Sequence, residues 1–425
     1  MINYTNIQIM KRIISLSLLS LIASDAFAGG YRISMQGQRQ LGMGHTGVGV
    51  FGQNAESVFF NPASGTFLKK KWSFSAGVTM LTSDVIFQNK TYNWSNETQN
   101  VGTPLYFYGN YQVSDRFSVG LAVYTPYGSA VEWDQDWEGS HLVNNIDLKA
   151  FYVQPTVSFK VTEDVSLGAG LIYVNGGVTF NRNLTRSLTD EMGNRSDITI
   201  EANGVHAWGY NLGLAAKLDD YVNFGINYRS QIDMKAEGGD ATFNDLPAFA
   251  QGIYQNGGFN ATMPLPAELT VGFSYQITDK WLAAVDWNYT YWNAYDNLTI
   301  GFENPAIPTS VNARNYKNSS TYRLGVQYQP NEKFSARIGG YFDESPVQEG
   351  YFAPETPRND ALAGTLGFSY NITSKLAVDF SATILKFKEV DASYDHYVED
   401  GRPVSFGGTY RSSAYSLGLG LSYNF

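Results

Sequence analysis

A chain of 425 residues with a formal net charge of −10 and no strongly basic block lacks the charge pattern of a nucleic-acid-binding protein. It contains no cysteine, which excludes a disulfide framework, thiolate chemistry and a cysteine-type zinc site. Charged residues make up only 16% of the chain and aromatic residues 15%, whereas soluble domains average about 25% charged residues, so the composition disfavours an ordinary soluble protein.

The first residues show the order of features expected of a secretory signal peptide. Lys11 and Arg12 precede an apolar run over 13–22, and small residues follow at 26–28. The apolar run is far shorter than the roughly twenty residues of a membrane-spanning helix, which favours cleavage before Gly29 over an uncleaved anchor. No later segment approaches eighteen continuous apolar residues, so helical spans are excluded and a transmembrane β-barrel becomes the leading class.

Alternation of apolar with small or polar residues recurs along the rest of the chain and predicts fourteen strands. It is clearest at the end of the chain. From Tyr415 to Phe425, aromatic or leucine side chains occupy every odd position, and Ser, Gly or Asn occupies every even position. One face of such a strand suits lipid and the other a wet lumen. We expect strands near 73–87, 103–113, 117–127, 147–161, 164–181, 197–218, 222–236, 266–278, 281–293, 318–329, 333–343, 360–371, 375–390 and 411–425.

The connections between these strands alternate between short and long. Short turns such as 114–115 and 219–220 are followed by much longer loops such as 128–146 and 237–265. Outer-membrane barrels have this asymmetry, with short periplasmic turns and long extracellular loops. A soluble β-sandwich is the alternative, because it also has alternating strands. The terminal Phe425, which is similar to the signal read by the outer-membrane barrel-assembly machinery, favours the barrel.

The segment before the first strand does not alternate. It is rich in glycine and ends in Asn61, Pro62 and Ala63. Eight strands make a barrel filled by its own side chains and sixteen leave an aqueous channel, so a barrel of fourteen strands needs a plug. A periplasmic tail is the alternative for this segment. We predict an all-β protein, a 14-stranded antiparallel transmembrane β-barrel plugged by an N-terminal hatch, with a signal peptide over 1–28, the hatch over 29–71 and the barrel over 72–425.

Several short motifs occur in the order found in one known family. They are Asn-Pro-Ala at 61–63, Tyr-Thr-Pro-Tyr-Gly at 124–128 followed by Trp133 and Trp137, Leu-Pro-Ala-Glu at 265–268, Asp-Glu-Ser-Pro-Val at 343–347 and Pro-Arg-Asn-Asp at 357–360. Through these residues the chain resembles the FadL/TodX family of outer-membrane transporters of long-chain fatty acids and other hydrophobic compounds. The resemblance implies a fourteen-stranded barrel, a hatch to which Asn61, Pro62 and Ala63 belong, and a hydrophobic capture groove on the outer loops.

The longest outer loop, 237–265, carries the apolar side chains expected of a capture site. Burying each methylene of a fatty acid is worth about 0.8 kcal/mol, and exposed apolar clusters usually mark binding sites. The alternative is that these side chains pack against neighbouring loops and cap the barrel. The candidate capture residues are Phe243, Leu246, Phe249, Ile253, Tyr254 and Phe259.

A carboxylate head group needs a cationic partner once it leaves bulk water. Three candidates lie on lumen faces of predicted strands: Arg229, Arg323 and Arg337. A fourth candidate, Lys317, lies at the outer end of the predicted strand 318–329. Arg323 and Arg337 lie on neighbouring strands and form the favoured pair. The alternative is that the arginines form ion pairs with lumen carboxylates such as Asp286 and Asp379.

Release into the membrane is implied by the resemblance, because family members open the barrel wall at an inward kink in the third strand. The matching place here contains Pro126 and Gly128. Proline cannot donate a ladder hydrogen bond and glycine often marks a bend, so the sequence permits a break there. The alternative is that both residues simply begin the outer loop.

The expected function is passive uptake of long-chain fatty acids or similar hydrophobic molecules by a monomeric protein in the outer membrane of a Gram-negative bacterium. Expected partners are the hydrophobic ligand, outer-membrane lipid and the barrel-assembly machinery, and no cofactor, metal or catalytic residue is expected. A general porin for small polar solutes is one rival. A lipid-hydrolysing enzyme is another, although there is no G-x-S-x-G motif and the histidines are scattered over positions 45, 141, 206 and 396.

Overall fold

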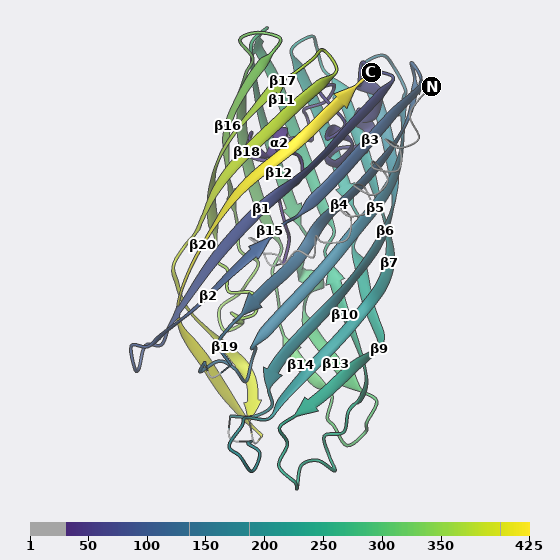
Figure 1. Cartoon of the computed structure of the whole chain (residues 1–425). Coiled ribbons are helices and arrows are strands. Elements are labelled where there is room, and N and C mark those ends of the chain that lie inside the picture. The colour runs from purple at the N-terminus through teal and green to yellow at the C-terminus, as the bar shows by residue number, and fades with distance from the viewer. Residues whose placement is uncertain (1–30, 136, 187, 400) are drawn as a thin grey trace, which may run out of the picture.

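Long tilted strands close into a barrel around a coiled N-terminal segment (Figure 1). The computed structural model describes residues 31–135, 137–186, 188–399 and 401–425. The expected signal peptide over 1–28 therefore lies outside the described residues. Within the described ranges, no helix has the length and apolar character needed to cross a membrane.

Twenty strand segments in the described part of the chain form one antiparallel sheet, which closes through the pairing of its first and last segments. Several barrel strands consist of two segments, so the barrel has fourteen strands, and the predicted fold class is confirmed in this respect. The segments are β1 (Trp72–Gln88), β2 (Ser95–Gly102), β3 (Leu105–Ser114), β4 (Phe117–Glu132), β5 (Asn145–Lys160), β6 (Val165–Asn183), β7 (Asp197–Lys217), β8 (Val222–Arg229), β9 (Ile232–Asn244), β10 (Gly257–Leu265), β11 (Glu268–Thr278), β12 (Trp281–Thr290), β13 (Asn297–Phe302), β14 (Ser310–Ala313), β15 (Ser319–Tyr328), β16 (Phe334–Asp343), β17 (Ala361–Asn371), β18 (Leu376–Phe387), β19 (Val390–Glu399) and β20 (Arg402–Asn424).

The closing pair shows why these sequences form a membrane wall. β1 and β20 pair from Ser73–Asn424 to Gln88–Thr409 without a break in register. On β20, Leu419 is 56% exposed on the outer face, whereas Ser422 is buried on the inner face. Since no water is available in lipid, closing the ladder satisfies the backbone groups that an open sheet edge would leave unpaired.

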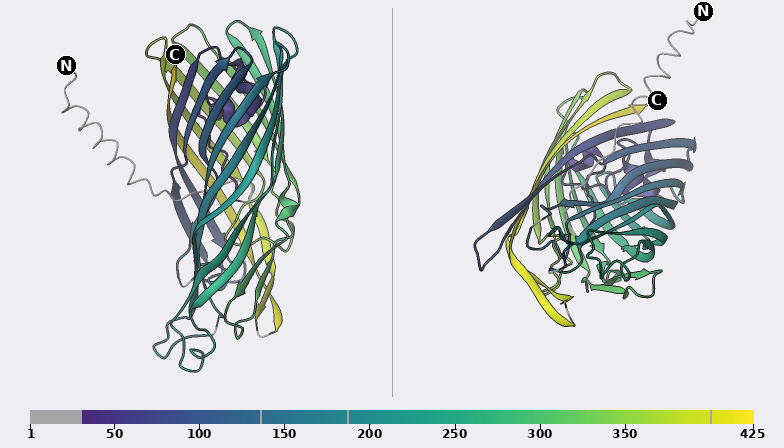
Figure 2. Two further views of the ribbon diagram at one scale, coloured as in Figure 1. Left: turned by 90° about the vertical axis from the view of Figure 1, so that its right-hand side faces the viewer. Right: turned by 60° about the horizontal axis from the view of Figure 1, so that its bottom comes forward.

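Parts of the predicted long loops are strands, which corrects those assignments. β2 lies in the predicted loop 88–102, and β19 with the beginning of β20 occupies most of 391–410. Figure 2 shows these hairpins continuing beyond the barrel wall at the end opposite the C-terminus. Ladder hydrogen bonds continue there although the outward residues are no longer apolar, so the alternation ends before the strands do. The same reason applies to β9 and β10 at the predicted loop 237–265 and to β13 and β14 in the predicted loop 294–317.

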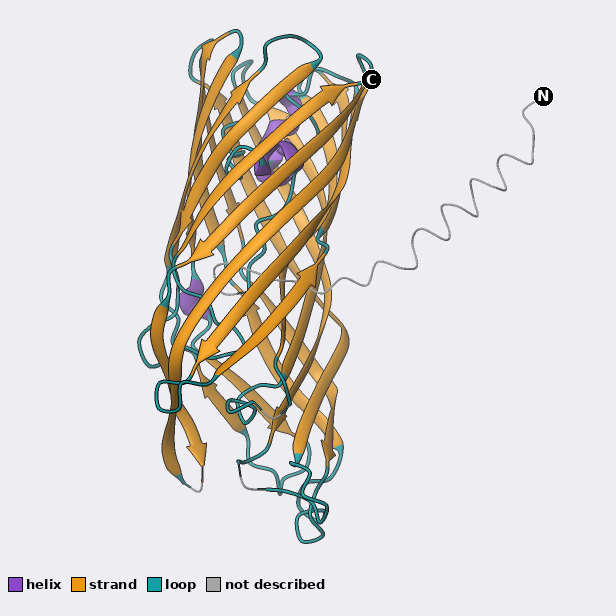
Figure 3. Ribbon diagram, turned by 60° about the vertical axis from the view of Figure 1, so that its left-hand side comes forward, coloured by secondary structure: helices purple, strands orange, loops and turns teal. Residues whose placement is uncertain are grey.

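The N-terminal segment lies inside the barrel, nearer to the end that holds the C-terminus and the short turns (Figure 3). It contains α2 (Gln38–Leu41), α3 (Ser57–Phe60) and the 3-10 turn η1 (Pro62–Phe67); a further 3-10 turn, η2 (Trp292–Ala294), lies in the barrel wall. Arg39 of α2 forms an ion pair with Asp379 of β18, with Nε 2.9 Å from Oδ1. The segment is therefore bound to inward-facing side chains of the wall.

Glycines of the wall provide room for the N-terminal segment. A Cβ atom at Gly225 would lie 2.0 Å from the carbonyl oxygen of Val48, and one at Gly213 would lie 2.3 Å from Oδ1 of Asn61. Such separations are well below van der Waals contact, so any larger residue would displace the segment. The inner wall carries glycines such as Gly213 and Gly225 where the segment contacts it, because the backbones of the segment and of the wall approach closely there.

Candidate functional site

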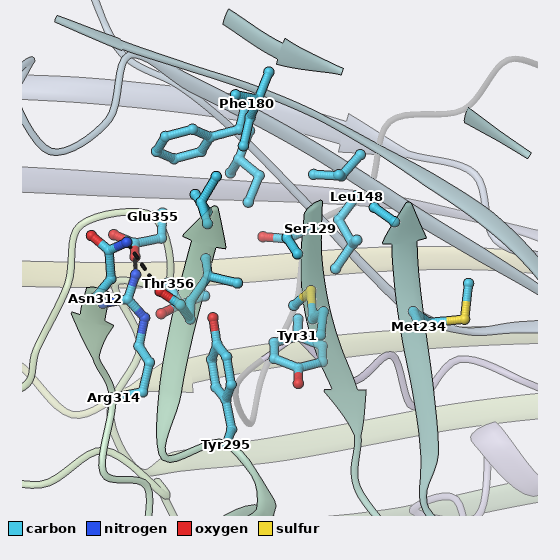
Figure 4. Close-up of a pocket in the computed structure, with 18 of the residues that line it drawn as sticks. Tyr31, Ser129, Leu148, Phe180, Met234, Tyr295, Asn312, Arg314, Glu355 and Thr356 are labelled. Carbon is cyan, nitrogen blue, oxygen red and sulfur yellow. Dashed lines mark hydrogen bonds and ion pairs between the residues drawn. The ribbon is translucent and has the colours of Figure 1, made fainter. Parts of the chain in front are cut away.

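An apolar cavity occupies the long-loop half of the barrel (Figure 4). About 1270 Å³ of space within it is not filled by atoms, and part of this space is open to solvent. Concave spaces with mainly apolar walls are typical ligand sites. Its apolar lining is Leu142, Ile146, Leu148, Ala150, Val178, Phe180, Ile200, Val205, Met234, Ala236, Phe259, Ala261, Met263, Leu265, Leu298, Ile300 and Ala353.

One end of the apolar cavity carries charge. Arg314 forms an ion pair with Glu355, and the Arg314 guanidinium lies 5.4 Å from the ring centre of Tyr394. Figure 4 shows Arg314, Glu355 and Asn312 together on the side away from Met234. Burial alone would lower the pKa of Arg314, but the charge of Glu355 outweighs it and raises the pKa, so the guanidinium stays charged. Arg182 and Lys149 also line the cavity. An apolar space with cations in its lining suits an amphiphile with an anionic head.

Sequence reasoning did not identify Arg314 or Glu355. They lie in two different outer loops of the predicted topology, 294–317 and 344–359, and no local pattern connects them. The predicted cation Lys317, which lies close to Arg314 in the sequence, was the only signal for this part of the chain. The contact depends on how the loops fold over the cavity.

Tyr31 forms the floor of the apolar cavity. Its ring centre lies 4.9 Å from that of Trp292 and 5.5 Å from that of Tyr295, both in edge-to-face geometry. Its hydroxyl donates a hydrogen bond to the carbonyl oxygen of Pro264. These contacts hold the start of the described chain across the lumen.

β4 leaves the regular wall next to Tyr31. Its residues from Tyr124 to Val131 are all buried, whereas a barrel strand normally buries every second residue. The pairing of β4 with β5 skips two residues between Tyr124 and Tyr127, which is a bulge. On the other edge, the ladder with β3 ends at the Tyr106–Tyr124 pair among the described residues. The strand therefore turns inward at Thr125 and Pro126.

The N-terminal segment pairs with β4 where the neighbouring barrel strand does not. Arg32 and Tyr127 form an antiparallel bridge. The Ile33 N–H donates to the carbonyl oxygen of Pro126 at 2.7 Å, and the Gly128 N–H donates to that of Tyr31 at 3.0 Å. The sequence-predicted residues Pro126 and Gly128 are thus both on the bulged stretch, and their backbone groups are satisfied from inside the barrel.

A second, smaller space lies on the other side of this bridge, and we call it the polar chamber. It is lined by Arg32, Ile33, Ser34, Gln36, His45, Val48, Phe59, Phe60, Pro126, Asn227, Arg229, Glu268, Thr270, Asn288 and Arg323, and about 430 Å³ within it is not filled by atoms. Tyr31 and Ser129 line the apolar cavity, while Arg32 and Pro126 line the polar chamber. The bridged backbones of the N-terminal segment and β4 therefore separate the two spaces.

Arg32 anchors the N-terminal segment from within the polar chamber. Its guanidinium lies 3.3 Å from a carboxylate oxygen of Glu268 and 3.3 Å from one of Asp343. It also donates hydrogen bonds to Thr290 at 3.0 Å and Thr321 at 2.8 Å. A buried cation with two carboxylates is well compensated, so Arg32 stabilises the position of the segment.

Two of the predicted arginines line the polar chamber together, but they are not the pair favoured from the sequence, Arg323 and Arg337. Arg229 and Arg323 both line the chamber. In the ladder, Arg323 lies opposite Tyr341 and Arg337 lies opposite Gln327, so these two arginines do not face each other. Arg337 instead donates hydrogen bonds to Gln327 at 2.8 Å and to Ser369 at 2.6 Å.

The lumen carboxylates Asp286 and Asp379 bind the N-terminal segment, and Asp286 also lies opposite Arg323 in the ladder without forming an ion pair with it. Asp379 pairs with Arg39. Asp286 accepts hydrogen bonds from the backbone N–H groups of Gly47 at 2.7 Å and Val48 at 3.1 Å. The fourth predicted cation, Lys317, is exposed and does not line the apolar cavity.

The Asn-Pro-Ala triplet lies against the wall. The side-chain amide of Asn61 donates to the carbonyl oxygen of Leu214 on β7 at 2.8 Å, and its Oδ1 accepts from the Ala63 N–H at 3.0 Å. Asn61 thereby caps η1, which Pro62 begins. The triplet fixes the turn that holds the segment on β6 and β7.

The predicted capture residues divide into two groups. Phe243 and Phe259 are buried with Ile198 and Ile200 in an outer apolar cluster, against which Leu246 and Tyr254 pack. Phe259 also lines the apolar cavity. By contrast, Phe249 is 77% exposed and Ile253 is 46% exposed. The same loop therefore both covers the cavity and presents apolar side chains to the outside.

The described residues contain no group of three or more His, Asp or Glu side chains arranged to hold a metal ion.

The comparisons with known proteins agree over nearly the whole chain. A family model described as outer membrane protein transport protein (OMPP1/FadL/TodX) matches residues 19–425. A 47 kDa outer membrane protein of Pasteurella multocida is 26% identical, over 96% of this chain and 97% of that protein. The long-chain fatty acid transport protein of Escherichia coli K12 is 21% identical, over 92% and 95%.

Solved structures are similar to the barrel as a whole. A FadL homologue of Pseudomonas aeruginosa has a TM-score of 0.82 at 18% identity, covering 93% of this chain and 100% of its own. The toluene transporter TodX of Pseudomonas putida has a TM-score of 0.71 at 17% identity, covering 94% and 99%. At such identities the structures establish the fold, and the family model establishes the relationship. The chain belongs to the OMPP1/FadL/TodX family of outer-membrane transport proteins.

Proposed function

We propose that this protein carries long-chain fatty acids, or apolar molecules of similar shape, passively across the outer membrane. The observation that supports this most directly is the apolar cavity that ends at the buried Arg314. Its walls match a hydrocarbon tail, and the guanidinium matches a carboxylate head. The relatives named as long-chain fatty acid transport proteins favour the same cargo.

Capture begins on the outer loop that contains Phe249 and Ile253. Both side chains are exposed, and Leu246 and Tyr254 of the same loop pack against the apolar cluster around Phe243. A fatty acid that leaves water at this loop gains free energy with every methylene it buries. Phe259 then lies between the outer cluster and the apolar cavity, so the route inward stays apolar.

The N-terminal segment acts as a hatch. It fills the short-turn half of the lumen with side chains such as Asn61 and Pro62, and it separates the apolar cavity from the polar chamber through the Arg32–Tyr127 bridge. A filled lumen excludes polar solutes, which a barrel of this width would otherwise admit. The cargo must therefore pass the bridge rather than the axis of the barrel.

Release occurs sideways into the membrane at the bulge of β4. The wall lacks a ladder between β2 and β4 among the described residues, and the N-terminal segment occupies the inner edge of β4 in its place. A hydrophobic molecule gains nothing by entering the aqueous periplasm, whereas lipid receives it without loss. Movement of residues 31–33 away from Pro126 would join the cavity to this part of the wall.

The remaining partners follow from this function. Outer-membrane lipid receives the cargo and surrounds the exposed apolar wall, and the barrel-assembly machinery inserts the strands. We propose that the protein acts as a single chain.

Uptake measurements test the proposal. Cells with and without the protein are given a fluorescent long-chain fatty acid and, separately, a small sugar. We expect loss of the protein to abolish fatty-acid uptake and to leave sugar flux unchanged. Sugar flux without fatty-acid uptake would instead identify a porin, and hydrolysis of added lipid would identify an enzyme.

The lateral route has its own test. Gly128 is replaced by tryptophan, whose bulk fills the bulged stretch of β4 beside Tyr31. Uptake should stop while fatty acid still binds at the cell surface. Normal uptake by a correctly assembled variant would contradict lateral release.

A further inference from the structure

We propose that the polar chamber is a second binding site on the route, which holds the carboxylate head of a fatty acid through Arg229 and Arg323. This inference rests on the proposed transport of fatty acids. It concerns a site separate from Arg314, on the other side of the Arg32–Tyr127 bridge.

The first observation is that two buried guanidinium groups of the chamber, those of Arg229 and Arg323, form no ion pair with a described carboxylate. Arg323 makes no hydrogen bond or ion pair with another described residue, and its Nε is buried without an acceptor. Arg229 donates hydrogen bonds to the carbonyl oxygen of Phe59, at 3.4 Å, and to the hydroxyl of Tyr124, and its Nε has no acceptor. Buried donors of this kind are costly unless a ligand or water satisfies them.

The second observation is that the nearby carboxylates are already engaged. Glu268 is the only carboxylate among the residues that line the chamber, and it accepts hydrogen bonds from Arg32 and Tyr127. The other near carboxylates, Asp286 and Asp343, bind backbone N–H groups and Arg32 respectively. The ladder places Glu268 opposite Arg229 and Asp286 opposite Arg323, but the ion pairs of the chamber are both made by Arg32, so the guanidinium groups of Arg229 and Arg323 keep free donors.

The shape of the chamber favours an amphiphile over a small hydrated anion. The Arg229 guanidinium lies 5.1 Å from the ring centre of Phe59 and 5.6 Å from that of Tyr124. Phe60, Val48 and Ile33 complete an apolar side next to the charged one. Arg229 on β8 and Arg323 on β15 line the chamber from strands separated by β11 and β12, so the carboxylate enters between them while its first methylenes contact these apolar side chains.

The position of the chamber gives the site a role in transport. Pro126, whose carbonyl oxygen holds the N-terminal segment on β4, also lines the chamber. A head group at Arg229 and Arg323 thus lies beside the bulge at which we place release. The chamber selects carboxylates, because an apolar molecule without a charged head gains nothing from the two guanidinium groups.

The test compares uptake of a long-chain fatty acid with uptake of the alcohol of the same chain length. In the Arg229→Gln/Arg323→Gln variant, the ratio of acid to alcohol uptake should fall at least tenfold. The Arg229→Lys/Arg323→Lys variant keeps both charges and should retain most of the ratio. A change in electrophoretic migration between unheated and heated samples checks that each barrel is folded. If the glutamine variant does not fold, the Arg323→Gln variant alone is used, since Arg323 has no partner to lose.

The outcomes separate this site from the proposed function. Uptake of both compounds by the wild type with an unchanged ratio in the glutamine variant would overturn the chamber site and leave fatty-acid transport intact. An equal fall for acid and alcohol would show that the arginines only support the fold, which also overturns the site. Uptake of neither compound by the wild type would refute fatty-acid transport itself and this inference with it.

Discussion

The N–H of Ile33 donates a hydrogen bond to the carbonyl oxygen of Pro126 at 2.7 Å, which binds the inner N-terminal segment to the one bulged stretch of β4. This bond and its partner from Gly128 to Tyr31 replace part of a missing strand ladder. They also close the space between the apolar cavity and the polar chamber. Opening the route therefore requires breaking a short β-bridge and the contacts of Arg32.

Locking this bridge should stop transport. Arg32 and Tyr127 form a pair flanked by the two bridging hydrogen bonds, and side chains of such pairs lie close together. In the Arg32→Cys/Tyr127→Cys variant, the two thiols can form a disulfide. We expect fatty-acid uptake to fall at least tenfold on oxidation and to recover on reduction.

The reduced form of the same variant is the matched control, because it also lacks the Arg32 ion pairs. The wild type contains no cysteine and should not respond to the oxidant. Equal uptake by the oxidised and reduced forms would show that the bridge does not move during transport.

A single methyl group on the inner wall should make the barrel leak. The Cβ atom of a Gly225→Ala variant would lie 2.0 Å from the carbonyl oxygen of Val48. Overpacking of this kind typically costs about 1–3 kcal/mol, so we expect displacement of the hatch and a higher flux of small sugars into proteoliposomes. Gly364→Ala on β17 is the control, because its added Cβ would have no neighbour within 4 Å. A tight barrel in both variants would refute the hatch role of the segment.

The Arg314–Glu355 pair should control affinity in opposite directions. Arg314→Gln removes the cation at the end of the apolar cavity and should weaken binding of a long-chain fatty acid at least tenfold, which corresponds to about 1.4 kcal/mol. Glu355→Gln removes the carboxylate that competes with the ligand for Arg314 and should strengthen binding. Calorimetry on the purified protein measures both. Weaker binding in both variants would mean that the pair only shapes the cavity.

The outer loops should loosen in acid because of His141. The side chain is largely buried between Tyr397 and Phe406, and neither ring nitrogen has a hydrogen-bond partner among the described residues. Burial, assisted by the charge of Arg186, lowers the pKa of His141 to about 4. The unfolded loop binds a proton near pH 6.5 and the folded loop only near pH 4, so stability is lost as the pH falls between these values.

Hydrogen exchange of the loops at a series of pH values measures this effect. Each unit of pKa difference corresponds to about 1.4 kcal/mol. In a His141→Phe variant, protection in this range should no longer depend on residue 141, while packing on Tyr397 is kept. The same pH dependence in the variant and the wild type would exclude His141 as its cause.

Much of the barrel could be predicted from local pattern. Alternation in stretches such as Tyr415 to Phe425 has a period of two residues, so it indicates a strand and its lipid face without any knowledge of distant contacts. Where the chain leaves lipid this constraint ends, and the strand segments β2 and β19 could not be recognised. The alternation of short and long connections was likewise a local signal, and it indicated the periplasmic and extracellular ends of the barrel.

The candidate site depends on contacts that no local pattern encodes. The alternation of outward and inward residues placed Arg229 and Arg323 in the lumen. Only the closed barrel determines that they line the same chamber and that Arg337 binds elsewhere. Arg314 and Glu355 meet because two outer loops fold over one cavity. The sequence by itself determined a membrane wall, since lipid acts on every outward residue alike. Tertiary structure alone decided which inward residues meet, because closing the barrel brings together side chains that are far apart along the chain.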